Sequence, residues 1–495
     1  MSAPSIAARL RPLVAFRGSA RVLHLTTLAF FASFVVWFNL APFAVAIRKE
    51  MHLTSAQMAT LALCNLALAV PARMAIGRLV GHVGPRRLYA GLLVFAAIPN
   101  TAFAMAHSYS VLVLSRLAVG IVGAGFVVGI KMVASWFPDD QLGTAEGVYG
   151  GWGNFGSAAA ALALPTVAAV VASGPGSWRW GVGLSGALAA IYGVVYFLAA
   201  DDPPATRRVP AKAVGLRARS RSGAVALVAM QVAVPGSLGL VAWRVYRAHV
   251  IGMSGLRVSG ALIAAFFAWQ LAGVVRSNRS RARDIDPVPV APVVILSLAY
   301  GVTFGAELTM ASLLPTFFAS TFGLKIAAAG AAGSAFAFTN LVTRPGGGVV
   351  SDLVRSRRGV VLGALVGSGV AFGVLTFLDR SWPLGVGVAA VAVTSIFVQG
   401  GNGAIFAMVP LVGRRSGGQV AGIAGSWGNA GGVLFSSVLF FTANNVRAVF
   451  GVIGVAALVV AVLCRWLPAP DGADVAPETD AIASVIDLTE APALV

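Results

Sequence analysis

Two arginines lie inside long apolar segments of this sequence, and each precedes a glycine-rich turn with basic residues. Arg73 lies 11 residues before Gly84, and Arg344 lies 11 residues before Arg355. At 1.5 Å per helical residue each separation is about 16 Å, which places both guanidinium groups near the middle of a bilayer. A charged side chain at that depth costs at least about 2.5 to 3.5 kcal/mol, so each arginine needs a partner.

The chemistry that suits such a pair is anion binding. A guanidinium is always charged, and its planar fork of donors matches a planar oxyanion or a carboxylate in bidentate fashion. The apolar segments at 57–80 and 326–350, which contain the two arginines, hold no Asp or Glu. We therefore predict that Arg73 and Arg344 bind one small anion. The alternative is that each arginine pairs with backbone carbonyls or with a carboxylate from another helix.

A repeated motif accompanies the two arginines. Gly-Trp-Gly-Asn-Phe-Gly at 151–156 recurs as Ser-Trp-Gly-Asn-Ala-Gly at 426–431. Small residues around both copies recur at helical spacing, which predicts faces for close helix packing. Asn154 and Asn429 interrupt these faces. Each amide could donate to an anion, hold the neighbouring arginine, or join two helices by a hydrogen bond.

Two further charged side chains fall well inside apolar segments. Glu307 follows Tyr300 and Phe304 at i, i+4 and i+7 spacing, which places all three on one helix face. Lys131 lies in an earlier segment. Three roles stay open: an ion pair between Glu307 and Lys131, a contact with substrate, or, for Glu307, carriage of a coupling proton. Glu146, near the end of its segment, is predicted to act at a gate or a helix interface.

Long apolar helices must position these side chains. The chain has 495 residues, is 58% hydrophobic and 11% charged, and has a mean hydropathy of +0.85. These values predict an all-α polytopic protein of the lipid bilayer. Charge-free runs of roughly 20 residues recur, which is the length of a transmembrane helix, and they lack the alternation of an outer-membrane strand. We predict about 14 such helices.

The pattern of charge and repetition divides the chain into seven parts. We predict a basic N-terminus, a six-helix bundle, a basic linker, an inserted two-helix hairpin, a second basic linker, a second six-helix bundle and an acidic disordered tail. Their bounds are 1–22, 23–200, 201–223, 224–275, 276–290, 291–467 and 468–495. Arg244 and Arg247, between the inserted stretches, leave open a hairpin that lies in the membrane interface instead of crossing.

The distribution of charge also sets the orientation and the partners. The net charge of +19 is spread over short loops and is not one patch with interleaved aromatics, which argues against nucleic acid. Basic loops such as Arg86–Arg87 predict a multi-pass protein of the cytoplasmic membrane with both termini in the cytoplasm. Two cysteines inside apolar runs and five scattered histidines predict no metal site and no cofactor. Without a nucleotide-binding or catalytic motif, we expect neither a pump driven by ATP nor an enzyme.

These motifs resemble the nitrate/nitrite porters of the major facilitator superfamily, and the resemblance covers both six-helix bundles. The family signature in helices five and eleven is glycine-x-glycine-asparagine-x-glycine. Its residues here are Gly151, Gly153, Asn154 and Gly156 in the first copy and Gly428, Asn429 and Gly431 in the second, where Ser426 replaces the first glycine. The turn after helix two has Gly81 where the superfamily usually has aspartate, whereas the turn after helix eight keeps Asp352.

The resemblance implies two bundles that rock about a central site, with the inserted hairpin outside the common twelve-helix plan. In the family the anion lies between the two arginines, here Arg73 and Arg344, and the signature asparagines line the same site. Tyr300 and Phe304 resemble the aromatic pair that contacts and gates the substrate, and Phe126 resembles a further aromatic wall. Ordinary helix packing is the alternative for these three rings.

We therefore predict a secondary transporter of nitrate, nitrite or both, which works by alternating access as a nitrate/nitrite antiporter or a nitrate/proton symporter. The first alternative is a carrier of another small anion, such as formate or oxalate. The second is a membrane sensor that binds an anion without moving it. We expect a monomer surrounded by lipid.

Overall fold

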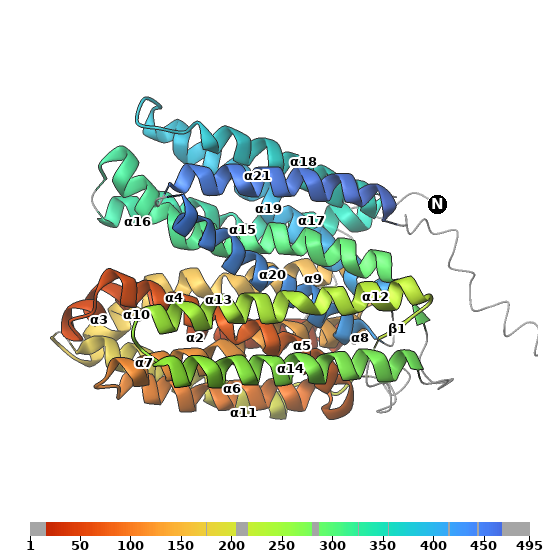
Figure 1. Cartoon of the computed structure of the whole chain (residues 1–495), viewed down its shortest axis with the longest axis horizontal. Coiled ribbons are helices and arrows are strands. Elements are labelled where there is room, and N and C mark those ends of the chain that lie inside the picture. The colour runs from red at the N-terminus through yellow and green to blue at the C-terminus, as the bar shows by residue number, and fades with distance from the viewer. Residues whose placement is uncertain are drawn as a thin grey trace, which may run out of the picture.

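The computed structural model describes residues 16–467, except residue 175 and residues 204–215, 280–286, 325, 355, 414–415 and 443–444. The predicted acidic tail, the first 15 residues and much of both basic linkers, with Arg355, Arg414 and Arg415, therefore lie outside the described residues. Apart from one short pair of strands, the described regular structure is helical. The helices lie side by side in two groups that are inclined to each other (Figure 1).

The first group of helices comes from the first repeat. It consists of α2 (Gly18–Phe38), η1 (Ala41–Phe43), α3 (Ala44–Glu50), α4 (Ser55–Ala67), α5 (Ala69–Val83), α6 (Pro85–Ala104), α7 (Tyr109–Gly120), η2 (Ile121–Ala124), α8 (Gly125–Trp136), α9 (Leu142–Asn154), α10 (Gly156–Val171) and α11 (Ser177–Ala199). Three of the long apolar runs are interrupted midway, between α4 and α5, between α7 and α8, and between α9 and α10.

The second group repeats this plan. It consists of α15 (Val290–Phe322), α16 (Ile326–Phe338), α17 (Asn340–Leu353), α18 (Arg357–Thr376), α19 (Leu384–Met408), η5 (Val409–Val412), α20 (Gly417–Phe441), α21 (Val446–Leu463) and η6 (Cys464–Trp466). Leu68 separates α4 from α5, and Thr339 separates α16 from α17. Arg73 and Arg344 each lie five residues after that break, so the two arginines occupy equivalent places.

The inserted segment forms two long helices. These are the run of α12 (Arg221–Ala229), η4 (Met230–Val232) and α13 (Ala233–Arg247), and the single helix α14 (Met253–Arg279). Each run has 27 residues and is about 40 Å long, which exceeds the thickness of the hydrocarbon layer. Together with ten runs of the two repeats, they make twelve described helices that could cross a membrane by length and composition. α16–α17 and α20 are not counted among these twelve, but they pack against helices that are, such as α19 and α15 (Figure 1).

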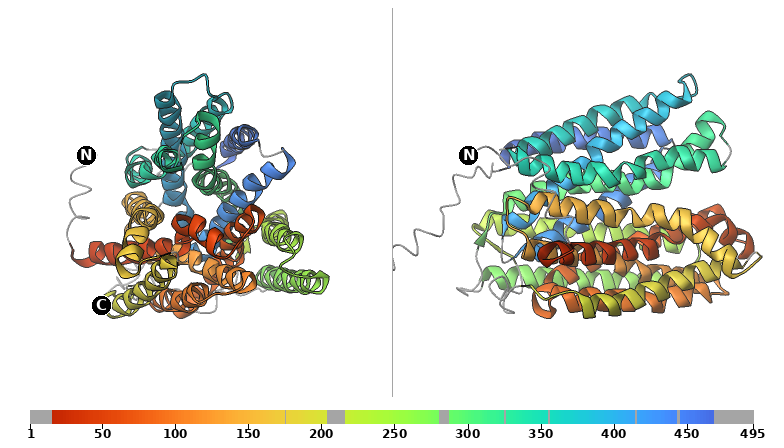
Figure 2. Two further views of the ribbon diagram at one scale, coloured as in Figure 1. Left: turned by 90° about the vertical axis from the view of Figure 1, so that its left-hand side faces the viewer. Right: turned by 180° about the vertical axis from the view of Figure 1, so that it is seen from behind.

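The segments that flank the hairpin pair with each other, and contacts along its length hold it to the first repeat and to α20. β1 (Arg217–Ala218) and β2 (Pro287–Val288) form a short parallel pair beside the loops that precede and follow it. Trp427 on α20 donates from Nε1 to the Met230 carbonyl at 3.0 Å. The Arg78 guanidinium lies 4.8 Å from the ring centre of Trp269. Figure 2 shows the hairpin helices at one edge of the molecule, outside the two repeats.

The two repeats meet tightly at the end of the bundle where Arg86, Arg87, Arg357 and Arg358 lie, which we call the arginine-rich side. Here α5 packs on α20, and α9 packs on α17. A Cβ added to Gly77 would lie 2.6 Å from the Gly418 carbonyl oxygen, and one added to Gly147 would lie 2.9 Å from Pro345 Cα. Glycine at these positions therefore permits backbone contact between the repeats.

Candidate anion-binding site

Arg73, on α5, lies between the two repeats and is fully buried, with 0% of its surface exposed. Its Nε donates to the Gly123 carbonyl at 3.1 Å, and its Nη1 donates to the Gly425 carbonyl of α20 at 2.9 Å. Its Nη2 has no hydrogen-bond partner among the described residues. Two donors therefore fix the guanidinium against both repeats, and one buried donor is left for a ligand.

Arg344, on α17, is equally buried, with 1% exposed. Its Nη2 donates to the Tyr300 hydroxyl at 3.3 Å, and its Nη1 lies 3.6 Å from Oε2 of Glu307. At 3.6 Å this is an ion pair and not a hydrogen bond, so Nη1 also remains without a hydrogen-bond acceptor. The sequence also allowed that each arginine pairs with backbone carbonyls or with a carboxylate from another helix. This alternative holds in part, because Arg73 bonds to carbonyls and Arg344 pairs with a carboxylate.

Two phenylalanine rings bring the arginines to one place. The guanidinium carbon of Arg73 lies 5.1 Å from the ring centres of both Phe126 and Phe304. That of Arg344 lies 5.6 Å from the Phe126 centre and 5.9 Å from the Phe304 centre. Both guanidinium carbons therefore lie within 5.6 Å of the Phe126 ring centre, which brings the two positive charges close together. Cation–π attraction partly offsets the repulsion between them.

Tyr300 completes this aromatic group. Its ring lies nearly parallel to that of Phe304, with centres 4.9 Å apart and an angle of 7°, and nearly parallel to that of Phe126, at 6.0 Å and 4°. The Phe406 ring from α19 meets Tyr300 edge-on at 4.6 Å. These rings are buried, so the two guanidinium groups lie in largely apolar surroundings. In such surroundings a charge-assisted hydrogen bond is stronger than in water.

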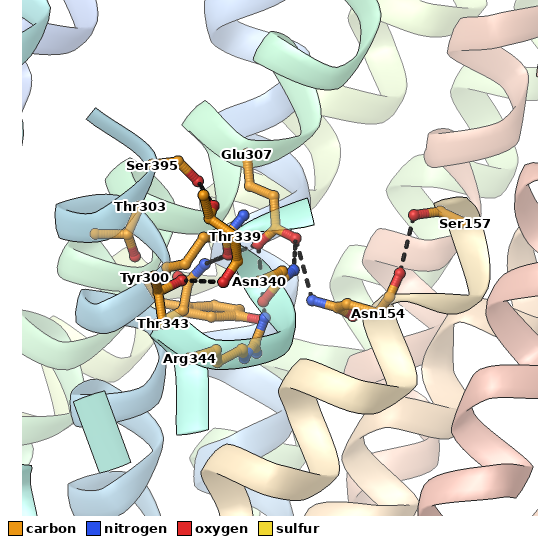
Figure 3. A network of polar contacts seen from close by, with 12 residues as sticks. Asn154, Ser157, Tyr300, Thr303, Glu307, Thr339, Asn340, Thr343, Arg344 and Ser395 are labelled. Carbon is orange, nitrogen blue, oxygen red and sulfur yellow. Dashed lines mark hydrogen bonds and ion pairs between the residues drawn. The ribbon is translucent and has the colours of Figure 1, made fainter. Parts of the chain in front are cut away.

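Glu307 is the acceptor of a polar network on α15 (Figure 3). Its Oε1 accepts hydrogen bonds from the side-chain amides of Asn154 at 3.2 Å and Asn340 at 2.9 Å, and its Oε2 accepts from Asn402 at 2.8 Å. With Arg344 these amides surround the carboxylate with donors. Of the three roles that the sequence left open, the ion pair between Glu307 and Lys131 is not found among the described residues, because Glu307 pairs with Arg344 of α17.

Lys131 lies elsewhere, on α8. A Cβ added to Gly418 of α20 would lie 3.9 Å from Lys131 Cδ, so the lysine stem packs at the contact between α8 and α20. This contact is at the arginine-rich side of the two central arginines. Both residues fall inside apolar segments of the sequence, but they lie on different helices and have different neighbours.

The two signature asparagines differ in their contacts. Asn154 joins α9 to Glu307 on α15, and so connects the repeats. Asn429, on α20, is 0% exposed, and neither its Nδ2 nor its Oδ1 has a hydrogen-bond partner among the described residues. A buried amide without partners costs free energy, so Asn429 has unused capacity to bind a ligand.

The signature glycines allow the close packing that positions these side chains. A Cβ on Gly151 would lie 2.7 Å from Pro345 Cδ, and one on Gly428 would lie 2.6 Å from the Tyr300 ring. Gly431 meets the backbone of Gly301. Gly153 and Gly156 make the corresponding contacts with Phe30 and Phe31 of α2. Glycine is thus needed for α9 to approach α17 and α2, and for α20 to approach α15.

The turns after α5 and α17 differ in the way that the sequence indicates. Asp352 accepts hydrogen bonds from the backbone amides of Gly143 at 3.1 Å and Thr144 at 2.6 Å, and from Arg357 at 3.0 Å. It therefore joins the start of α9 to the second repeat. At Gly81 a Cβ would meet nothing within 4 Å. Gly81 has no side chain that could accept hydrogen bonds as Asp352 does, so the turn after α5 lacks this connection at that position.

Sequence reasoning missed three buried polar residues. Asn340 and Asn402 bind Glu307, and each could have been found as an amide inside an apolar run, Asn340 four residues before Arg344. Arg116, on α7, is 0% exposed and donates to Asn39 Oδ1 at 2.8 Å and to the Trp37 carbonyl at 2.5 Å. It is a third arginine inside an apolar segment, and both of these hydrogen-bond acceptors are neutral. Within the described residues, no group of His, Cys, Asp or Glu could hold a metal ion.

Comparisons with known proteins show the family of the chain. Residues 26–282 and 296–493 match the model of the Major Facilitator Superfamily. The chain is 39% identical over 477 residues to the nitrate/nitrite transporter NrtP of Nostoc punctiforme, covering 94% of this chain and 95% of that protein. It is 28% identical to the high-affinity nitrate transporter 2.3 of Oryza sativa subsp. japonica, covering 93% of this chain and 80% of that protein.

A solved structure shows the same fold. The fucose:proton symporter FucP of E. coli superimposes with a TM-score of 0.60 at 12% identity, covering 91% of this chain and 99% of that one. The helical architecture, the matched family model and the 39% identity to NrtP together assign the relationship. The chain belongs to the nitrate/nitrite porter family of the major facilitator superfamily.

Proposed function

We propose that this protein is a secondary transporter of nitrate and nitrite that holds the anion between Arg73 and Arg344. The observation that carries the proposal is that one buried arginine from each repeat faces the same two rings, Phe126 and Phe304. The donors left without acceptors are Nη2 of Arg73, Nη1 of Arg344 and Nδ2 of Asn429. A flat oxyanion with two or three oxygens fits such a set of donors.

The charges of the site favour a monovalent anion. Arg73 and Arg344 contribute two positive charges, and Glu307 contributes one negative charge to the hydrogen-bonded network. One positive charge then remains in a water-poor environment, where an uncompensated charge is costly. Nitrate or nitrite would neutralise it. The relatives named as nitrate/nitrite transporters support the same choice of substrate.

Movement of one repeat against the other would carry the anion across. Arg73 bonds to a carbonyl of α20, and Asn154 bonds to Glu307 of α15, so the site residues themselves bridge the repeats. The arginine-rich side is sealed by contacts of Gly77 with Gly418 and by the hydrogen bonds of Asp352. We propose that these contacts separate when the site opens to that side, and that this side faces the cytoplasm, as the excess of arginine in its loops indicates.

Glu307 acts, in this proposal, as the fixed counter-ion of Arg344. Each of its hydrogen-bond neighbours in the described network is a donor, which suits a carboxylate that only accepts. Its other predicted role, as the carrier of a coupling proton, stays a prediction. Nothing in the geometry requires a partner chain, and a monomer also stays a prediction.

The test is transport by the purified protein in proteoliposomes. We expect external nitrate to enter when the vesicles contain nitrite or when an inward proton gradient is imposed, and we expect formate and oxalate to compete weakly. If formate or oxalate is transported while nitrate is not, the substrate assignment is wrong. If nitrate binds but neither anion moves under any gradient, the protein is a sensor and not a carrier.

A further inference from the structure

One buried acid has no place in the network described above. Glu146, on α9, is 2% exposed, and neither carboxyl oxygen has a hydrogen-bond partner among the described residues. An ionised carboxylate without a donor is costly in such surroundings, whereas a carboxylic acid is tolerated far better. The Glu146 carboxyl group therefore needs a proton in this conformation, or a cation that reaches it in another conformation.

The geometry identifies the cation as Arg344. Gly150 lies four residues after Glu146, so both face the same side of α9, about 6 Å apart along the helix. A Cβ added to Gly150 would lie 2.6 Å from Arg344 Nε. Glu146 is therefore one helical turn from the Arg344 side chain, on the arginine-rich side of it, within the swing of an arginine side chain.

The other charged groups on the helices packed against α9 are paired with other residues or, as for Lys131, pack by their stem against another helix. Asp352 on α17 binds Thr144 and Arg357. Lys131 on α8 packs beside Gly418. α2 carries Arg21, paired with Asp201, and His24, stacked on Phe16, both at its start. The sequence of α19 contains no acidic or basic residue. On α9 itself, the Tyr149 hydroxyl donates to the carbonyl of Phe126.

Glu307 and Glu146 lie on opposite sides of Arg344 along the membrane normal. α15 runs away from the arginine-rich side, and Glu307 lies seven residues, about 10 Å, beyond Tyr300, which also bonds to Arg344. α9 runs in the same direction, and Glu146 comes before Gly150. Arg344 thus has one carboxyl on each side, of which Glu307 is bound in this conformation and Glu146 is not.

We propose that Glu146 is the proton-carrying residue of the transport cycle and the second ion-pair partner of Arg344. This inference rests on the proposed function, because it concerns how nitrate movement is coupled. When the anion occupies the site, Glu146 holds a proton and is neutral. When the anion leaves toward the arginine-rich side, the Glu146 carboxylate replaces it as the partner of Arg344.

This exchange balances both protons and charge. On release of the anion, the O–H bond of Glu146 breaks, the proton passes to water on the arginine-rich side, and the carboxylate pairs with Arg344. The loaded cluster contains Arg73, Arg344, the Glu307 carboxylate and one anion, and its net charge is zero. The empty cluster contains the Glu146 carboxylate in place of the anion, and its net charge is again zero. When the empty carrier opens to the opposite side, the Glu146 carboxylate takes a proton from water there, and the next anion replaces it beside Arg344. One nitrate would therefore travel with one proton in each cycle.

The experiment compares two activities of Glu146→Gln in proteoliposomes. The first is nitrate uptake driven by an inward proton gradient, with an internal pH dye to report acidification. The second is exchange of external nitrate for internal nitrite without a pH gradient, in which the carrier never returns empty. The matched control is Glu50→Gln, an acid that pairs with Arg179 at 2.8 Å outside this cluster. Using the ratio of the two activities removes differences in the amount of folded protein.

We expect Glu146→Gln to retain exchange, while its proton-driven uptake falls at least about tenfold relative to exchange and the acidification signal disappears. The empty variant would carry an uncompensated buried charge that opposes its return. Glu50→Gln should keep the wild-type ratio. An unchanged ratio in Glu146→Gln overturns the proposal, as does loss of both activities in folded protein or a wild type that exchanges anions without moving protons. A wild type that moves no nitrate refutes the proposed function itself.

Discussion

Replacing Arg73 by lysine isolates the contribution of the guanidinium fork from that of the charge. In the structure Nε and Nη1 are used by the carbonyls of Gly123 and Gly425, and Nη2 is left for the anion. A lysine ammonium is a single point on a flexible stem, so it cannot hold two carbonyls on separate helices and also present a donor at the position of Nη2. The positive charge remains, but the directed hydrogen bond to the anion is lost.

The expected magnitude follows from that single hydrogen bond. A hydrogen bond to a charged group contributes about 1.5 to 3 kcal/mol, so the apparent KM for nitrate should rise by about 10- to 150-fold in Arg73→Lys. The assay is the initial rate of nitrate exchange in proteoliposomes as a function of nitrate concentration, with thermal unfolding of the same preparation measured in parallel.

Arg116→Lys is the matched control for this variant. Arg116 is as buried as Arg73 and also donates to a carbonyl, but its partners are Trp37 and Asn39, and it has no contact with Phe126 or Phe304 in the structure. We expect a lower unfolding temperature and an unchanged KM. A wild-type KM in Arg73→Lys would refute the fork as the binding element. A KM change of the same size in Arg116→Lys would show that burial of arginine, and not its place in the site, is what matters.

Two further predictions test the counter-ion and the helix packing. Glu307→Gln removes the negative charge beside Arg344, so the anion should bind several-fold more tightly and leave more slowly. This would appear as a lower KM and a lower kcat in nitrate exchange. Unchanged values of both would contradict the counter-ion role. Gly428→Ala would place a Cβ 2.6 Å from the Tyr300 ring, so nitrate exchange should fall severalfold. Gly81→Ala is the control, because a Cβ there meets nothing within 4 Å, and this variant should exchange nitrate at the wild-type rate. Equal activity of the two variants would contradict the packing argument.

Much of the architecture was predictable because its signals are local in the sequence. Apolar runs, the repeated Trp-Gly-Asn motif and the spacing of each arginine from its turn depend only on helix geometry and hydration. The structure accordingly places Arg73 and Arg344 at equivalent positions after equivalent helix breaks. The Glu307 network was not predictable in the same way, because its amides come from α9, α17 and α19, three helices that are far apart in sequence.

The sequence by itself determined that this protein lies in a membrane, that it is built from two repeats, and how far along its helix each charged side chain lies from the nearest turn. That distance follows from a fixed rise per residue, so it needs no knowledge of other helices. Only the tertiary structure decided which charges meet, because that depends on the rotation of each helix and on its neighbours. Glu307 therefore pairs with Arg344 and not with Lys131, and Glu146 lies one turn from the same arginine without a hydrogen-bond partner in the described part of the chain.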